Sequence, residues 1–390
     1  MQSRVLPAGL ALARGAARDA ALLDAWRALW VSRLLVWAAG VVAVLAFGLS
    51  ARASDFDPAG LTSPFGATGD ALVAPAARWD SVWYLAIAGD GYEGGAREAF
   101  FPLYPLLVRA GGALVGSPLI AGALISTALL AVALVLLHRL VALDFGRDVA
   151  RNAVLAARHD RWALAGTLGA LAATTRSAGV LLLVPLALIY LYGAGRPSLR
   201  PRALRPDVLW LALVPLGLGA FCAYLGATGH DALAPFRAQE VWFRSFAGPF
   251  AGAWDGVVAG VQGMRQLLSG SRSPVYFAQA GGDPFVVARH NVELLTWLVL
   301  LVPAAIGALR RLPSAYGAYL VAAIALPLSY PVAPQPLMSL PRFVAVLFPL
   351  AIWLALWMTG RPWRERLVLA AFAVALAVYT AIFATWHWVA

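Results

Sequence analysis

Residues 117–137 read SPLIAGALISTALLAVALVLL and contain no charged side chain. A helix needs about 20 apolar residues to cross the ~30 Å hydrocarbon core of a bilayer, so this run predicts a membrane-crossing helix. Similar apolar runs occupy residues 26–48, 162–175, 177–193, 207–227, 292–309, 314–331, 343–359 and 367–388. The sequence therefore predicts an all-α, polytopic helical membrane protein with about nine crossing segments, forming a single integral membrane domain over residues 1–390.

The composition of the chain excludes several classes of protein. Of its 390 residues, 61% are hydrophobic and 13% are charged, and the mean hydropathy is +0.76. Soluble domains are typically about 45–50% apolar and about 25% charged, so a soluble enzyme is excluded. Runs of about ten residues with alternating hydrophobicity, which an outer-membrane barrel requires, do not occur in the sequence.

The charge and the cysteine count narrow the possible partners. The net charge is +11, and every basic residue is Arg. No soluble element carries a basic face or tail, so a nucleic-acid partner is not expected. Cys222 is the single cysteine and lies in an apolar run, which excludes a disulfide framework and a cysteine metal site. The five His residues are scattered, so neither a metal site nor a cofactor is expected.

The basic residues of the short loops predict the orientation, because cytoplasmic loops carry an excess of Arg and Lys. The N-terminal stretch and the loops after the second, fourth, sixth and eighth predicted segments contain Arg4, Arg14, Arg18, Arg27, Arg139, Arg147, Arg151, Arg158, Arg161, Arg196, Arg200, Arg202, Arg205, Arg310, Arg311, Arg361, Arg364 and Arg366. These loops share one side if residues 162–193, too long for one untilted helix and short for two, cross twice. We therefore expect a multi-pass protein of the cell membrane, with a cytoplasmic N-terminus, an outside C-terminus and long outer loops at about 49–116 and 228–291.

The densest group of charged and aromatic residues lies in the first of these loops. Residues 78–92 read RWDSVWYLAIAGDGY. In a helix that begins near Asp80, this carboxylate shares one face with Trp83, Tyr84 and Ile87. Two interpretations of Asp80 are open. It caps the start of the helix, where its oxygens satisfy free N–H groups, or it is the acid of an active site just outside the bilayer.

A second stretch follows in the same loop. Residues 99–109 read AFFPLYPLLVR. Leu103–Val115 is expected to form a short helix that lies in the membrane interface, where Trp and Tyr side chains favour the headgroup depth.

These two stretches closely resemble the signature of the PIG-V-like mannosyltransferases of the GT-C superfamily. In that family a W-D-x-x-W-Y-x-x-I-A-x-x-G-Y element precedes an A-F-F-P-L-Y-P element in the first extracytoplasmic loop. Further matches follow in order over most of the chain, at Arg161-Trp162, Thr175–Gly179, Gln239–Trp242 with Arg244, Leu340–Phe343 and Phe348-Pro349. The resemblance implies a GT-C-like fold.

The chain departs from the family pattern after the second predicted segment. Family members usually carry a further hydrophobic hairpin there, whose outer tip holds a Tyr-x-Glu element. In this chain Arg151–Leu155 runs almost directly into Ala156–Arg161, so about thirty residues, the length of a helical hairpin, are missing. Removing a hairpin preserves the topology of everything after it, but it also removes an acidic loop. An alternative interpretation therefore stays open: the chain is a degenerate or inactive relative of the family.

The resemblance implies a reaction at the outer membrane surface. Mannose would pass from a polyprenyl-phosphate-mannose donor to a hydroxyl of a glycan or glycolipid acceptor, through an oxocarbenium-like state. A carboxylate takes the acceptor proton, and fixed cations stabilise the departing phosphate. Asp80 is the implied base. The implied substrate-binding residues are Arg78, Trp79, Trp83, Tyr84, Tyr92, Tyr104, Arg109, Arg176, Gln239, Trp242, Arg244 and Arg342.

Four of these residues, Arg109, Arg176, Arg244 and Arg342, are candidates for the phosphate. Each has a plainer interpretation: Arg109 snorkels from an interfacial helix, and Arg342 flanks a crossing segment. Arg176 is the strongest candidate, because an Arg inside an apolar run is costly without a partner. Gln239, Trp242 and Arg244 also suit a sugar, although Trp242 and Phe243 equally suit packing of the loop onto the membrane.

A transporter or lipid flippase, or a non-catalytic membrane scaffold, is the alternative class of function. Transporters carry polar or broken helices that meet near the bilayer midplane, often in internal repeats. Here the ionisable residues concentrate in the outer loops, with Arg176 the main exception, which favours chemistry at the surface. The missing hairpin favours the scaffold.

Overall fold

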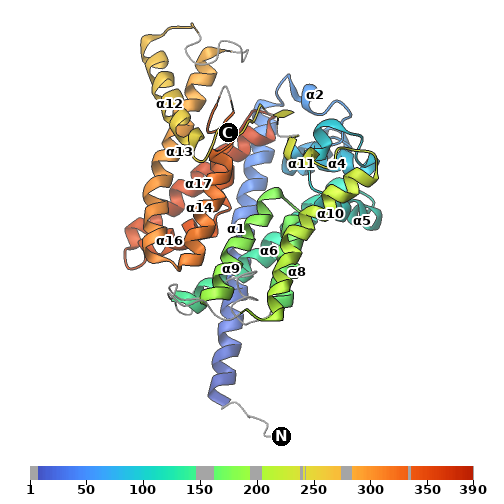
Figure 1. The fold of residues 1–390 in the computed structure, drawn as a ribbon. Helices are drawn as coiled ribbons and strands as arrows, with labels where there is room; N and C mark the ends of the chain where they lie inside the picture. Colours follow the sequence, from blue (N-terminus) through green and yellow to red (C-terminus); the bar gives the residue numbers. More distant parts are fainter. Residues whose placement is uncertain are drawn as a thin grey trace. The chain divides into compact units, whose positions relative to one another are not determined.

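The computed structural model describes residues 8–145, 162–193, 204–237, 240–241, 243–273, 283–332 and 335–389, with the side chains of 8–21, 141–145 and Ser177 left out (Figure 1). The chain divides into two compact units. Unit 1 comprises Met1–Gly91, Pro105–His159 and Arg366–His387, and unit 2 comprises Tyr92–Tyr104, Asp160–Glu365 and Trp388–Ala390.

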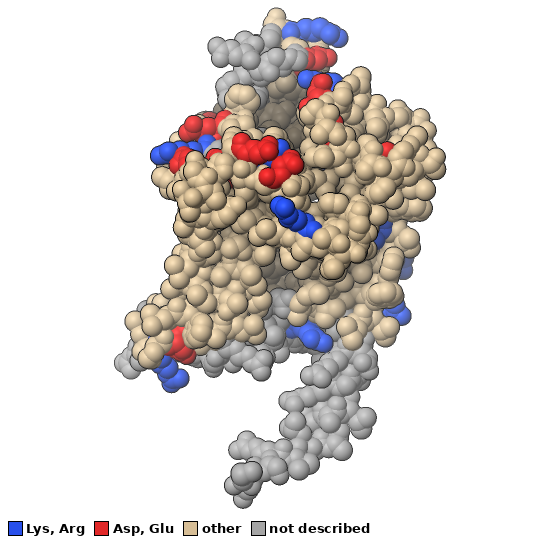
Figure 2. All heavy atoms as spheres, turned by 90° about the vertical axis from the view of Figure 1, so that its right-hand side faces the viewer, with Lys and Arg blue, Asp and Glu red and all other residues tan. Residues whose placement is uncertain are grey.

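The secondary structure of the described residues is helical, apart from an isolated antiparallel bridge between Arg244 and Val332. Five of the described helices are long and apolar enough to cross a membrane: Leu22–Phe47, Pro118–Leu140, Pro206–Ala227, Pro284–Arg311 and Pro362–Ala384. Shorter apolar helices cover Leu103–Val115, Trp162–Ala173, Ala178–Tyr192, Ser314–Leu328 and Phe348–Met358. The prediction of an all-α membrane protein is confirmed, while the count of nine crossing segments stays a prediction. Figure 2 shows a surface made mainly of uncharged side chains, as a multi-pass membrane protein requires.

Unit 1 is built around the long helices α1 (Ala8–Phe47) and α6 (Pro118–Phe145), which pack against each other. The last part of α17 (Pro362–Ala384) also packs on α1, because Gly40 offers no side chain there. A Cβ atom at Gly40 would lie 3.0 Å from Pro75 and 3.6 Å from Ala384. This close approach fastens the first loop to α1.

The first loop of the chain is itself helical. It contains α2 (Ala53–Phe56), α3 (Gly66–Val73), a 3₁₀ turn η1 (Ala74–Ala76), α4 (Asp80–Asp90) and α5 (Leu103–Val115). The helices predicted from Asp80 and over Leu103–Val115 are both present. On α5 the buried residues are Pro105, Val108 and Gly112, whereas Leu106 and Leu114 are exposed. This is the pattern of a helix that packs one face against the protein and turns the opposite face outward.

Unit 2 begins with a helical hairpin where the sequence left one or two crossings open. Helix α8 (Trp162–Ala173) ends before Arg176, and the chain continues through the 3₁₀ turn η3 (Ser177–Leu182) into α9 (Leu183–Tyr192). The first residue of α8, Trp162, meets Tyr190 near the end of α9 at 4.7 Å between ring centroids. The two helices are therefore antiparallel, with Arg176 at the turn. Both are shorter than the ~20 residues of a full crossing.

Small residues let the helices of unit 2 approach closely. Gly166 of α8 faces the Trp210 carbonyl of η4 (Pro206–Ala212), and Gly217 of α10 (Leu213–Ala227) faces the Ala170 carbonyl. A Cβ atom at Gly217 would lie 2.5 Å from that oxygen, too close for any other residue type. Such contacts are typical of helices that pack in membranes.

The rest of unit 2 follows the same pattern. A glycine face on α12 (Ala251–Ser269) packs along α13 (Pro284–Arg311), which is followed by α14 (Ser314–Leu328), α15 (Leu340–Ala345) and α16 (Phe348–Met358). Two short elements complete the unit, η2 (Gly95–Ala99) and α11 (Ala234–Arg237).

Candidate functional site

The sequence feature that carries Asp80 forms the start of α4. The N-cap position belongs to Trp79, whose φ of 54° breaks the preceding chain sharply, and Asp80 is the first helical residue. Asp80 is exposed, and at this position its charge favours the positive end of the helix dipole. The interpretation of Asp80 as the N-cap is therefore wrong by one position.

The predicted face of α4 runs from an exposed end to a buried one. Asp80 is exposed, Trp83 and Tyr84 are half-buried, and Ile87 is 5% exposed. The carboxylate thus stands at the open end of a face that carries two aromatic rings. This arrangement suits a group that meets a ligand from solvent while the rings are anchored in unit 1.

Arg78, one residue before the cap, is buried within unit 1, with 2% of its surface exposed. Its Nε donates to the Ala384 carbonyl at 3.2 Å, and its Nη1 lies within hydrogen-bonding distance of the Thr62 hydroxyl at 3.3 Å. Burial lowers the pKa of Arg78 to about 10, against the opposing effect of Asp57 and Asp70. In this conformation Arg78 ties the first loop to the end of α17.

Aromatic rings pack around Arg78 and Trp79. Trp79 packs against Phe56 at 4.5 Å and against Trp386 at 5.5 Å between ring centroids, and Arg78 lies over the Trp386 ring at 5.4 Å. Arg78 and Trp79 thus hold the backbone on which Asp80 begins α4. Rings and cations at this spacing attract each other by about 0.5–2 kcal/mol.

Unit 2 contains a cluster of three arginines from three distant parts of the chain. Their guanidinium carbons lie within 6 Å of the Phe343 ring centroid: Arg176 at 5.1 Å, Arg244 at 5.6 Å and Arg342 at 5.8 Å. We call these three residues and Phe343 the arginine cluster. Three cations around one ring repel one another, and an anion bound beside them would offset that repulsion.

Arg244 is the fixed member of the arginine cluster. It is half-buried, and its Nη1 and Nη2 donate to the carbonyls of Tyr330 and Met338 at 3.1 and 3.0 Å. Burial, and then the charges of Arg342 and Arg176, lower the pKa of Arg244 to about 10, which keeps it charged at neutral pH. These two backbone carbonyls hold the guanidinium in place.

The other two arginines are exposed. Arg176 leaves the end of α8 as the N-cap of η3, and Arg342 lies on α15, where its Nη2 reaches the Ser339 hydroxyl at 3.4 Å. Ser339 adopts a φ of 68°, a conformation that costs free energy and turns the chain into α15. One anchored and two accessible guanidiniums are a set of donors suited to phosphate oxygens.

Comparison with known proteins finds no relative: no family model, curated protein or solved structure matches the chain. The resemblance to the PIG-V-like family is therefore carried by the quoted residues alone.

The remaining implied site residues are dispersed. Tyr92 packs in unit 2, where its hydroxyl donates to the Phe100 carbonyl at 2.7 Å, and Tyr104 is half-buried at the start of α5. Arg109 is exposed on α5 in unit 1. Gln239 and Trp242 lie outside the described residues, as does the stretch 146–161 that contains the shortened connection.

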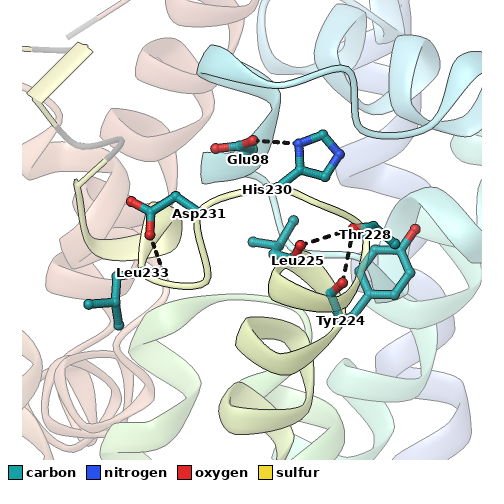
Figure 3. Close-up of polar contacts among 7 residues, drawn as sticks. All are labelled: Glu98, Tyr224, Leu225, Thr228, His230, Asp231 and Leu233. Carbon is teal, nitrogen blue, oxygen red and sulfur yellow. Dashed lines mark hydrogen bonds and ion pairs between the residues drawn. The ribbon is translucent and has the colours of Figure 1, made fainter.

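The structure also brings together a pair that the sequence did not suggest. His230 Nδ1 lies 2.9 Å from an oxygen of Glu98, although the two residues belong to different loops (Figure 3). No spacing rule connects residues so far apart, so the sequence shows His230 only as one of five scattered histidines. Within the described part of the chain, no group of three His, Cys, Asp or Glu side chains is placed to hold a metal ion.

Proposed function

We propose that the protein transfers mannose from a polyprenyl-phosphate-mannose donor to an acceptor hydroxyl at the outer face of the membrane. The observation that carries the proposal is the arginine cluster. The leaving group of a lipid-linked donor is a polyprenyl phosphate, and its growing negative charge must be stabilised as it leaves. Arg176 and Arg342 of the cluster lie within Thr175–Gly179 and Leu340–Phe343, two of the stretches that resemble the family pattern.

In the proposed reaction the bond between the anomeric carbon and the phosphate oxygen breaks, and a new glycosidic bond forms to the acceptor oxygen. The polyprenyl phosphate departs with the electrons of the broken bond, and Arg176, Arg244 and Arg342 bind it. The base that takes the proton of the acceptor hydroxyl is proposed from the sequence resemblance, which assigns this role to Asp80. Positioned proton transfer of this kind contributes about 10²–10⁴-fold to a rate.

The rings near Asp80 support a role in sugar binding. Trp83 and Tyr84 share its helix face and present aromatic surface and polar groups together, which suits a hydroxylated ring. We assign Arg78 and Trp79 to the same site as the residues that hold Asp80 in place, on the strength of the Arg78 hydrogen bonds to Thr62 and Ala384.

A flippase for phosphate-linked lipids is the second candidate, because a cluster of arginines binds a lipid phosphate whether or not the sugar is transferred. The two are separated by incubating purified protein with a polyprenyl-phosphate donor that carries radiolabelled mannose and a panel of acceptors. A labelled glycan or glycolipid product supports transfer. Movement of the donor between leaflets of a vesicle, without any product, supports the flippase.

A further inference from the structure

Glu98 and His230 form a carboxylate–imidazole pair that joins the two long loops within unit 2. Glu98 lies in η2 and His230 in the turn after α10, and Glu98 Oε1 is 2.9 Å from His230 Nδ1 (Figure 3). Glu98 is only 9% exposed. A carboxylate withdrawn from water to this degree is costly unless a hydrogen-bonding partner stays beside it.

The residues that follow Glu98 pack into an aromatic cluster. Phe101 packs on Phe221 at 5.1 Å between ring centroids, together with Leu225 of the same helix. The Tyr92 hydroxyl donates to the carbonyl of the residue before Phe101. The segment 98–101 is thus fixed both by the pair and by the rings.

This segment leads directly to the arginine cluster. The Leu103 N–H donates to the Thr174 carbonyl at 3.2 Å. Thr174 is the first residue after α8, and two residues later Arg176 caps η3 and lies over Phe343. The hydrogen bond from Leu103 therefore acts on the turn that gives Arg176 its direction.

We propose that Glu98 and His230 are positioning residues for the arginine cluster. They hold segment 98–103 on the end of α10, and that segment holds the Thr174 carbonyl and so the turn from which Arg176 projects. The inference rests on the proposed function, in that the cluster binds the phosphate of a lipid. Without the pair, the segment loosens and Arg176 no longer holds one direction.

The same turn offers a matched control. Arg237 Nη1 lies 2.9 Å from an Asp231 oxygen, and Asp231 follows His230 directly in the chain. The side chains of the Arg237–Asp231 ion pair are 65% and 41% exposed, so it contributes little to stability or position. Arg237→Gln removes a charge pair next to His230 and leaves Glu98 paired.

The test measures binding of farnesyl phosphate to the full-length protein in detergent, followed by tryptophan fluorescence. His230→Ala is expected to weaken binding about tenfold, which is about 1.4 kcal/mol, whereas Arg237→Gln binds like the wild type. The double variant Arg176→Ala with His230→Ala is expected to bind no more weakly than Arg176→Ala alone, since residues that act through one group are not additive.

Additive losses in the double variant, or unchanged binding in His230→Ala, overturn the positioning role and leave the proposed function standing. Unchanged binding in Arg176→Ala overturns the phosphate site itself, and the positioning role with it. If His230→Ala does not fold, the exchange variant Glu98→His with His230→Glu replaces it. The exchange keeps both groups and is expected to bind within about twofold of the wild type; a loss as large as that of Arg176→Ala overturns the inference.

Discussion

The guanidinium carbon of Arg244 lies 5.6 Å from the centre of the Phe343 ring. Arg244 reaches this position because the carbonyls of Tyr330 and Met338 hold its two terminal nitrogens, while Arg176 and Arg342 approach the same ring. The lowered pKa of Arg244, about 10, shows that burial and its two neighbours make its charge costly. A phosphate bound here would relieve that cost and raise this pKa again.

Arg176 is expected to bind the phosphate through its planar fork. Arg176→Ala should weaken farnesyl phosphate binding about tenfold or more, because a charge-assisted hydrogen bond contributes about 1.5–3 kcal/mol. Arg176→Lys should restore binding only in part, since Lys lacks the bidentate fork. Wild-type affinity in Arg176→Ala would leave Arg176 with a structural role at the end of α8.

Replacing Arg342 should have opposite effects on thermal stability and on phosphate binding. In Arg342→Gln the cluster loses one repelling cation, so the pKa of Arg244 should rise toward its ordinary value, and the melting temperature without ligand should stay equal or increase. Phosphate binding should weaken in the same variant. Thermal unfolding with and without farnesyl phosphate measures both. A lower melting temperature without ligand would contradict the repulsion on which the anion site depends.

Arg78 is expected to matter for stability. Arg78→Met should lower the free energy of unfolding by about 2 kcal/mol or more, because the Thr62 hydroxyl and the Ala384 carbonyl lose a buried donor. Arg52→Gln is the control, since the Arg52–Asp55 ion pair of the same unit is exposed and should contribute less than about 1 kcal/mol. Equal melting temperatures for the two variants would remove the structural role of Arg78.

Local features of this fold follow from the sequence because they depend on neighbouring residues. Five of the predicted apolar runs correspond to the five candidate spans, and the helices expected from Asp80 and over Leu103–Val115 are present. The break at Arg176 was visible as a charge inside an apolar run. The sequence does not decide whether residues 162–193 fold back on themselves. The antiparallel arrangement of α8 and α9 is shown by the contact between Trp162 and Tyr190, which is a tertiary contact.

The candidate site was predictable only as separate residues. The sequence singles out Arg176, Arg244 and Arg342 one by one, but only the fold brings Arg176 and Arg244, which lie far from Phe343 in the chain, to the ring beside Arg342. The Glu98–His230 pair has the same origin. The cap at Trp79 is not predictable from neighbouring residues, because Trp79 combines a positive φ with packing against Phe56 and Trp386, which are distant in the chain.

The orientation of the chain is tested by labelling single cysteines in a Cys222→Ser background. Ala96→Cys lies in the loop predicted to be outside and should react with an impermeant reagent in intact cells. Trp363→Cys lies in the first turn of α17, next to the loop predicted to be cytoplasmic; Trp363 is exposed, and the cysteine should react only after permeabilisation. The reverse pattern would invert the topology and place the proposed reaction on the wrong side.

The central claim is tested most directly by mannose transfer from a radiolabelled polyprenyl-phosphate donor, measured for the wild type and for Asp80→Asn with their melting temperatures. Asn keeps the shape of the side chain at the exposed start of α4, so the melting temperature should change little. The account predicts turnover by the wild type and a loss of about 10²–10⁴-fold in Asp80→Asn, because the general base is gone. Absence of transfer by the wild type to every acceptor tested, or near-normal turnover in Asp80→Asn, would contradict it.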